Sequence, residues 1–139
     1  RTIGRRQDVP EAVREELESA IEKTKGHTKL DLILALSYGS RVEITEAMQG
    51  MAREVKAGKL DPDQIREETV AEHLYTHGIP DPDLLIRTSG EMRISNFMLW
   101  QISYAEIVVT PVLWPDFGEE DFAKALADYA ARDRRFGGI

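Results

Sequence analysis

Short apolar runs alternate with amphipathic segments along this chain, and the alternation restricts the folds open to it. Residues Leu30–Leu36, Asp83–Arg87 and Ile107–Thr110 are apolar runs of strand length. The first is nearly continuous, as in strands covered on both faces. Strands that alternate with helices imply right-handed crossovers and a mainly parallel central sheet with helices on both faces. The sequence therefore predicts the α/β class.

The predicted helices are located by their start and stop signals. Asp8 and Pro10 suit the start of a helix that Lys25-Gly26 ends, and Ser40 with Glu43 forms a capping-box pattern. Asp61–Gln64 and Thr69–Glu72 repeat that pattern. The expected helices thus run over 8–25 and 40–58, over two short segments that begin at 61 and 69, over a buried segment 96–102 after Ser95, and over 119–134.

Length and composition limit the number of domains and exclude several classes of protein. A chain of 139 residues fits a single domain, which we expect to cover 1–139. The absence of cysteine excludes disulfide scaffolds and Cys-ligated metal sites, and the net charge of −7 opposes binding to nucleic acid. No apolar run approaches the roughly 20 residues of a membrane-spanning helix. The first residues, Arg1-Thr-Ile, look like part of a strand, so we expect the carboxyl portion of a longer protein.

The loop after the strand Asp83–Arg87 is the strongest candidate for chemistry. Ligands of open parallel sheets lie beyond the carboxyl ends of the strands. This loop offers two guanidinium groups, Arg87 and Arg93, the flexible Gly90 and a predicted helix start at Ser95. Guanidinium forks and free amides at a helix start both bind phosphate oxygens, so the loop predicts a diphosphate cradle. The alternative is that both arginines pair with Glu91 or Asp83.

Other polar residues give weaker signals. Glu106 opens an apolar strand, where its carboxylate could hold Mg²⁺ or be an ordinary charge at a strand start. The turn Ser37–Arg41 could approach a ligand, although Ser40 as a helix cap explains it better. His73 and His77 lack the glutamate of a zinc-protease motif and a third ligand. Trp100 and Trp114 are assigned to the core.

Several stretches together resemble one family. Asp83–Gln101, Tyr104–Glu106, Val112–Phe117 and Arg134–Gly138 are similar to the cis-prenyltransferases, also called isoprenyl transferases. Ala35–Ile44 resembles the segment after a central strand of that family. The similarity covers almost the whole chain, and the run from 83 to 117 is highly specific. The resemblance implies the cis-prenyltransferase fold, of which the amino-terminal part is missing here.

The resemblance also implies an activity. Family members condense isopentenyl diphosphate onto an allylic diphosphate such as farnesyl diphosphate, and each new double bond is cis. By this likeness, Arg87, Arg93 and Ser95 hold the diphosphate of isopentenyl diphosphate, and Ile94 of the same loop is a further substrate-binding residue. Glu106 matches a Mg²⁺ ligand. Arg135 and Gly137 match an R-x-G motif that reaches a neighbouring subunit, which implies a homodimer.

The sequence also departs from the family pattern. An Asp-Gly-Asn-Gly-Arg-Trp motif, which supplies the principal Mg²⁺-binding aspartate, is absent, as are segments that hold the allylic substrate and line a hydrophobic tunnel. No catalytic residue is therefore assigned, and residues 1–139 alone are expected to be inactive. Ser37 and Ser40 replace the Asn and Gly of the family's Asn-Tyr-Gly-Gly-Arg turn. Met92 replaces a residue that is polar in many members.

Two other functions remain open at this point. The chain could be a non-catalytic, dimerising partner subunit of a cis-prenyltransferase, or a general phosphate-binding α/β domain. The family likeness and the lack of a targeting signal favour the cytoplasm, near the membrane that receives the lipid product. The sequence does not reveal the length of the product or the allylic primer.

Overall fold

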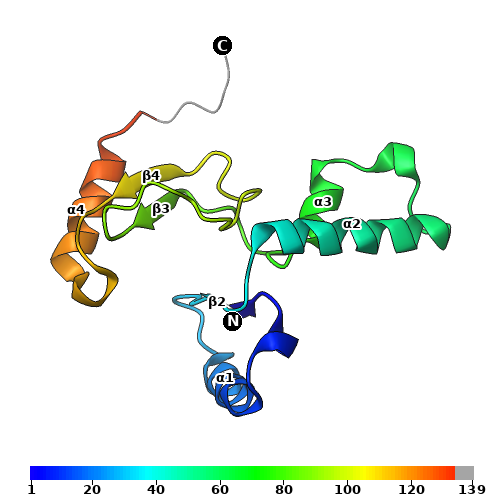
Figure 1. Ribbon diagram of the computed structural model, residues 1–139, viewed down its shortest axis with the longest axis horizontal. Helices are drawn as coiled ribbons and strands as arrows, with labels where there is room; N and C mark the ends of the chain where they lie inside the picture. The colour runs from blue at the N-terminus through cyan, green and yellow to red at the C-terminus, as the bar shows by residue number, and fades with distance from the viewer. Residues whose placement is uncertain (134–139) are drawn as a thin grey trace. The chain divides into compact units, whose positions relative to one another are not determined.

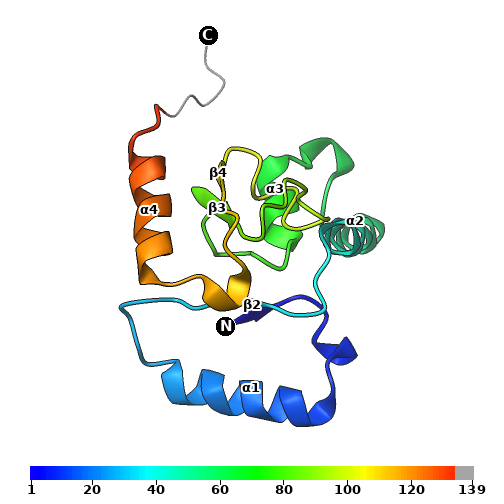
Figure 2. The ribbon, with the colours of Figure 1, turned by 60° about the vertical axis from the view of Figure 1, so that its left-hand side comes forward.

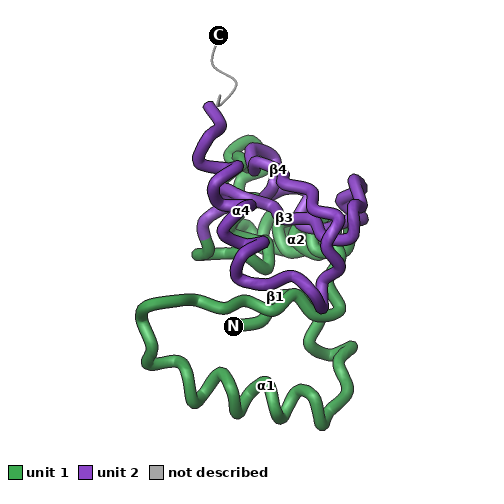
Figure 3. Tube along the Cα trace, turned by 90° about the vertical axis from the view of Figure 1, so that its left-hand side faces the viewer, with its two compact units in different colours: residues 1–79 green, residues 80–139 purple. Residues whose placement is uncertain are grey.

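The computed structural model describes residues 1–133, which contain four α-helices and four strands. The chain divides into two compact units, residues 1–79 and 80–139, coloured separately in Figure 3. The described strands form two parallel pairs, one in each unit. The predicted α/β class is confirmed. A single domain over 1–139 stays a prediction.

The first unit begins with a strand–helix–strand crossover. Strand β1 (Thr2–Ile3) pairs in parallel with β2 (Leu34–Ala35), and α1 (Glu11–Thr24) lies between them in the sequence (Figure 2). Pro10 is the N-cap of α1. Asp8 instead lies in a 3-10 helix, Arg6–Asp8, and its carboxylate is 3.3 Å from Arg5 Nε. The prediction that Asp8 begins the helix is therefore wrong, because Arg5 engages its side chain.

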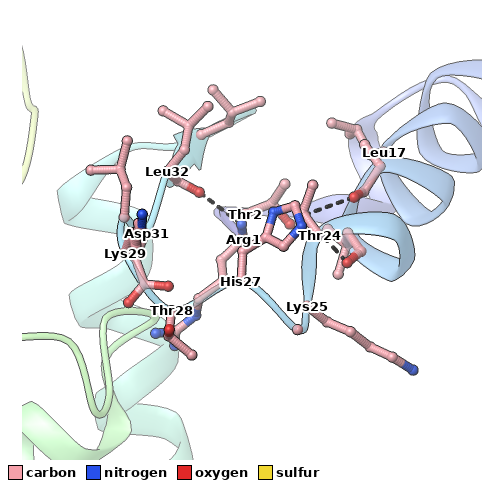
Figure 4. A pocket seen from close by; sticks show the side chains of 15 residues that line it. Arg1, Thr2, Leu17, Thr24, Lys25, His27, Thr28, Lys29, Asp31 and Leu32 are labelled. Atoms are coloured by element: carbon pink, nitrogen blue, oxygen red, sulfur yellow. Dashed lines mark hydrogen bonds between the residues drawn. The ribbon is translucent and has the colours of Figure 1, made fainter.

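Strand β2 is much shorter than predicted. The apolar run 30–36 contributes only two paired residues, and Leu30 and Leu32 are 81% and 67% exposed. The described part of the chain gives β2 only β1 as a neighbour, and β1 itself has two residues. A cavity of about 900 Å³ lies between this run and α1, with Leu17 and Leu32 on its walls (Figure 4). It contains none of the residues predicted to bind a ligand.

Helices α2 (Ser40–Lys56) and α3 (Glu67–His73) pack against each other in the first unit, and a short 3-10 helix, Pro62–Gln64, lies between them in the chain. Asp61 caps that 3-10 helix, as its sequence pattern predicts. The other two capping predictions are wrong. Gly39, not Ser40, is the N-cap of α2, and α3 starts at Glu67, where Thr69 Oγ1 accepts a hydrogen bond from the Arg66 amide.

Glu43 does not cap α2 because its side chain is buried and forms other hydrogen bonds. This residue is fully buried, with an exposed fraction of 0%. Its carboxylate accepts hydrogen bonds from Tyr38 Oη at 2.5 Å and from the Tyr75 amide at 2.9 Å. Tyr75 Oη also donates to Glu46, and burial, followed by that contact, raises the pKa of Tyr75. Glu43 thus joins the turn before α2 to the segment after α3.

The second unit is built on the other strand pair. Strand β3 (Leu84–Arg87) runs parallel to β4 (Glu106–Val109), with Leu84 opposite Glu106 and Arg87 opposite Val109. A 3-10 helix (Trp114–Asp116) follows, and α4 (Glu119–Ala130) then packs against β4 (Figure 1). Glu106 is the first residue of β4, as the sequence predicts, and the strand ends at Val109, one residue before Thr110.

The predicted helix over 96–102 is wrong. These residues form consecutive turns, and Ser95, Asn96 and Met98 have φ values of 52°, 62° and 48°. Such left-handed conformations interrupt a right-handed helix. Within this segment Gln101 and Ile102 are buried, at 2% and 7% exposure, whereas Leu99 is 40% exposed. The expected burial therefore holds for the last two residues of the segment but not for all of it.

Few side chains are fully buried in either unit. The buried apolar residues among those described are Ile3, Ala47, Met51, Leu74, Ile102, Val108 and Ala125. Trp114 is 73% exposed and stacks on Phe117, so its assignment to the core is wrong. Helix α4 ends at Ala130, four residues before the predicted end. No described helix is long and apolar enough to cross a membrane.

Gly4 provides a test of the first strand pair. Its φ of +104° is disfavoured for residues with a side chain, and a Cβ built there would lie 2.2 Å from Leu36 O. We expect Gly4→Ala in the complete protein to lower the free energy of unfolding by about 2 kcal/mol or more. Urea denaturation measures this change. Gly26→Ala is the matched control, because a Cβ at Gly26 meets nothing within 4 Å. Equal free energies of unfolding for the two variants would contradict the close approach of Gly4 to Leu36 O.

Candidate functional site

Three of the residues predicted to bind the substrate line one cavity in the second unit. Arg87 ends β3, and Arg93 and Ile94 lie in the loop that follows. The cavity has a volume of about 200 Å³. Glu91 also lines it, and the rest of the wall is apolar: Leu85, Ile86, Met92, Phe97, Ile107 and Val109. Two cationic groups therefore meet in a largely apolar cavity at a strand end.

The loop is held against the end of the neighbouring strand. Ser89 and Gly90 adopt left-handed conformations, with φ values of 64° and 65°. Their amides donate to Val112 O and Thr110 O, each at 2.8 Å. These contacts tie the loop to the residues that follow β4. The carboxyl ends of both parallel strands thus contribute to one locality, where open α/β sheets bind ligands.

The two arginines differ in their surroundings. Arg93 is exposed, and its Nη1 lies 2.5 Å from Glu91 Oε2. The ion-pair alternative therefore holds for Arg93. Arg87 is partly buried, and its Nε atom is buried with no hydrogen-bond partner in the described part of the chain. A buried donor without a partner costs roughly 1–3 kcal/mol, so the Nε of Arg87 is an unsatisfied donor beside this cavity.

Ser95 does not provide a helix start. It is exposed, its φ of 52° lies outside the helical region, and turns follow it. The contribution that we expected from a helix dipole is therefore absent from the cradle. Ser95 also does not line the cavity of Arg87 and Arg93. The electrostatic attraction for an anion comes from the two guanidinium groups.

Glu106 already has a cationic neighbour. Its Oε2 accepts a hydrogen bond from Arg132 Nη1 at 2.9 Å, and Arg132 Nη2 donates to Asp128 Oδ2 at 2.9 Å. The contact with Glu106, followed by that with Asp128, raises the pKa of Arg132.

Glu106 is at the amino end of β4, opposite Leu84, and does not line the cavity of Arg87 and Arg93 at the carboxyl end of β3. Mg²⁺ typically binds through one or two carboxylates together with substrate phosphates and water. The described residues contain no cluster of three potential ligand side chains, so Glu106 would be one ligand of an ion held mainly by other groups.

The remaining candidates lie elsewhere. Arg135 and Gly137 fall outside the described residues. His73 has both ring nitrogens engaged, Nδ1 with Thr69 O at 2.8 Å and Nε2 with Glu54 Oε2 at 3.3 Å. The bond to Thr69 and the contact with Glu54 both raise the pKa of His73. These contacts give His73 a structural role between α2 and α3.

Sequence reasoning missed two residues of this region. Glu91 entered only as a partner in the ion-pair alternative, although it also lines the cavity. Arg132 was not considered, yet it contacts Glu106. Its spacing of four from Asp128 was the available signal, because residues at i and i+4 share a helix face. Nothing in that spacing indicates Glu106, which is distant in the sequence.

A protein-family profile described as "Putative undecaprenyl diphosphate synthase" matches residues 1–137. An isoprenyl transferase of Heliobacterium mobile is 55% identical over 139 residues, which are 100% of this chain and 54% of that protein. An isoprenyl transferase of Geobacillus kaustophilus is 51% identical over 137 residues, 99% of this chain and 53% of that protein. The chain thus spans about half the length of these curated relatives.

Two solved structures are also similar. Lavandulyl diphosphate synthase from Lavandula x intermedia, in complex with dimethylallyl diphosphate, has a TM-score of 0.94 and 43% identity, over 99% of this chain and 59% of its own. A probable undecaprenyl diphosphate synthase from Campylobacter jejuni has a TM-score of 0.82 and 36% identity, over 99% of this chain and 62% of its own. The fold described above is therefore shared with the matched parts of these two proteins.

Proposed function

Because the chain belongs to the undecaprenyl diphosphate synthase family of cis-prenyltransferases, we propose that it binds isopentenyl diphosphate within an enzyme that elongates prenyl chains. The observation that carries the proposal is the placement of Arg87. Arg87 lines the same cavity as Arg93, at the carboxyl end of a parallel strand, and its buried Nε has no hydrogen-bond partner among the described residues. Guanidinium groups bind phosphate oxygens through paired hydrogen bonds, and the apolar wall accommodates a short isoprenoid unit.

Each proposed residue has a definite task in this reaction. Arg87 donates to the diphosphate of isopentenyl diphosphate. Arg93, which is exposed, leaves Glu91 and turns toward the same diphosphate, while Ile94 contacts the isoprenoid part. Ser95 supplies a hydroxyl at the edge of the loop. Placing the two substrates together lowers the entropic cost of their reaction.

The reaction joins two diphosphate esters. The double bond of isopentenyl diphosphate attacks the allylic carbon of a substrate such as farnesyl diphosphate and forms a new carbon–carbon bond. The allylic carbon–oxygen bond breaks and releases inorganic diphosphate, and a proton leaves the new unit. Repetition gives a cis-polyprenyl diphosphate such as undecaprenyl diphosphate, the compound that the family profile names. Bound Mg²⁺ would neutralise charge on the diphosphate groups, and Glu106 is the residue of this chain that would hold it.

Other parts of the proposal rest on family membership. We assign Arg135 and Gly137 to contacts with the active site of a second copy in a homodimer. The proposed location is the cytoplasm, at the membrane that takes up the lipid product. The sequence retains both arginines and Glu106, which a scaffold without catalysis would not require, and this favours the enzyme over the partner subunit.

A product assay tests this function. The complete protein, incubated with radiolabelled isopentenyl diphosphate, farnesyl diphosphate and Mg²⁺, is expected to form a butanol-extractable polyprenyl diphosphate, and chelation of Mg²⁺ is expected to abolish its formation. Residues 1–139 alone are expected to form none. Turnover by residues 1–139 alone would refute the expectation that these residues hold only part of the active site. A complete protein that forms no prenyl product would refute the proposed reaction.

A further inference from the structure

Glu91 and Arg93 form an ion pair in the wall of the cavity that also contains Arg87. All three side chains line this cavity of about 200 Å³. Arg93 Nη1 lies 2.5 Å from Glu91 Oε2, whereas the buried Nε of Arg87 has no hydrogen-bond partner among the described residues. The two guanidinium groups therefore start from different states, because Arg87 has an unsatisfied donor and Arg93 is already engaged by a carboxylate.

The surroundings of the pair indicate which of its side chains turns when an anion binds. Glu91 follows Gly90, whose amide donates to Thr110 O at 2.8 Å, so the backbone before Glu91 is tied to the residue that follows β4. The side chain of Glu91 is 37% exposed and that of Arg93 is 69% exposed. Exposed ion pairs are weak, so breaking this one costs little. A bound anion can therefore draw Arg93 away while Glu91 stays at the cavity.

Glu91 and a diphosphate compete for Arg93. A carboxylate and a phosphate both accept hydrogen bonds from the two arms of a guanidinium fork, so only one of them occupies it fully. When the diphosphate holds Arg93, the freed Glu91 carboxylate remains beside it with a charge of the same sign. Glu91 therefore opposes retention of the diphosphate in two ways, because it can recapture Arg93 and it repels the bound anion.

The proposed reaction requires the diphosphate to leave this cavity after each addition. The allylic diphosphate is the leaving group, so the elongated product keeps the diphosphate that arrived on isopentenyl diphosphate. Loss of a proton makes the new unit allylic, and the product then serves as the allylic substrate of the next addition. Its diphosphate must first leave Arg87 and Arg93, because the next isopentenyl diphosphate binds there.

We propose that Glu91 is an internal competitor for Arg93, which recaptures the guanidinium group and so clears the cavity of diphosphate between successive additions. This inference rests on the proposed function. Because Glu91 acts through Arg93, it is a positioning residue and needs no contact with the reacting carbon atoms.

Calorimetric titration of the complete protein with inorganic diphosphate measures the competition without turnover. We expect Glu91→Gln to bind diphosphate about 3- to 10-fold more tightly, because an exposed ion pair accounts for up to about 5-fold and loss of the repulsion adds to it. In the Arg93→Met background, Glu91→Gln should give only the smaller gain that comes from repulsion. Glu120→Gln is the control, since it removes an exposed charge of α4 outside the cavity lining, and it should bind like the wild type.

Analysis of early products measures the clearing. With labelled isopentenyl diphosphate and farnesyl diphosphate, Glu91→Gln is expected to accumulate the product of a single addition, because the diphosphate of that product leaves the cavity slowly. The wild type should form longer chains in the same time. The same early product distribution in both proteins, or a wild type that adds only one unit, would overturn the clearing role even if Glu91→Gln binds diphosphate more tightly.

The binding outcomes separate this inference from the function on which it rests. Wild-type or weaker diphosphate binding by folded Glu91→Gln, with weaker binding by Arg87→Ala and Arg93→Met, would overturn the competition and leave the proposed site intact. An equal gain with and without Arg93 would mean that Glu91 acts by repulsion alone, and it would also overturn the competition. Diphosphate binding that neither arginine variant alters would refute the proposed function as well.

Discussion

Replacement of Arg87 by alanine or methionine in the complete protein is expected to raise the KM for isopentenyl diphosphate and to slow turnover. Loss of one charged hydrogen-bonding partner in a partly buried site costs about 2–4 kcal/mol, which corresponds to roughly 30- to 1,000-fold in binding. The fold should not suffer, because Arg87 Nε is buried without a partner among the described residues. Removal of such a donor leaves stability unchanged or raises it by about 1 kcal/mol.

Steady-state kinetics and urea denaturation of the same variants measure both effects. Arg53→Met is the matched control, since Arg53 is exposed on α2 and, among the described residues, its side chain hydrogen-bonds only to Gln49, at 3.5 Å. It should change neither quantity. Wild-type kinetics in folded Arg87→Ala, or a large loss of stability in Arg87→Met, would assign Arg87 a structural role instead.

Replacement of Glu43 by alanine is expected to have the largest effect on stability. The change leaves Tyr38 Oη and the Tyr75 amide without their buried acceptor. Each unsatisfied buried donor costs about 1–3 kcal/mol, so the free energy of unfolding should fall by about 3 kcal/mol or more. Glu43→Gln keeps the shape and one acceptor oxygen, and it should lose less. Urea denaturation of the complete protein measures the free energy of unfolding, which should fall in the order wild type, Glu43→Gln, Glu43→Ala.

Glu22→Ala is the control for this prediction. Glu22 is 70% exposed in an ion pair with Lys25, and exposed pairs contribute at most about 1 kcal/mol. Equal losses in Glu22→Ala and Glu43→Ala, or wild-type stability of Glu43→Ala, would contradict the role of Glu43 as the link between the turn before α2 and the segment after α3.

Local patterns predicted the class of fold and most helices but not the chemistry at their ends. The apolar period of α2 gave its extent to within two residues, whereas Ser40 and Glu43 looked like a capping box. Glu43 is instead buried against Tyr75, a residue 32 positions away in the sequence. Such long-range partners compete with local caps, and a pattern of four residues carries no information about them.

The candidate site was likewise predicted only where local sequence patterns determine it. The motif around Arg87 and Arg93 indicated which residues line the cavity, because both flank a strand end. The helix expected after Ser95 was wrong, since left-handed conformations at Ser95, Asn96 and Met98 replace it with turns. The link between Arg132 and Glu106 spans 26 positions and depends on α4 packing beside β4, which no spacing reveals.

A crystal structure of the complete protein with isopentenyl diphosphate tests the central claim most directly. The account predicts diphosphate oxygens within about 3 Å of the Arg87 guanidinium, including its Nε, in the cavity that Arg93 and Ile94 line. A diphosphate bound at another strand end, with Arg87 Nε still without a partner, would contradict it.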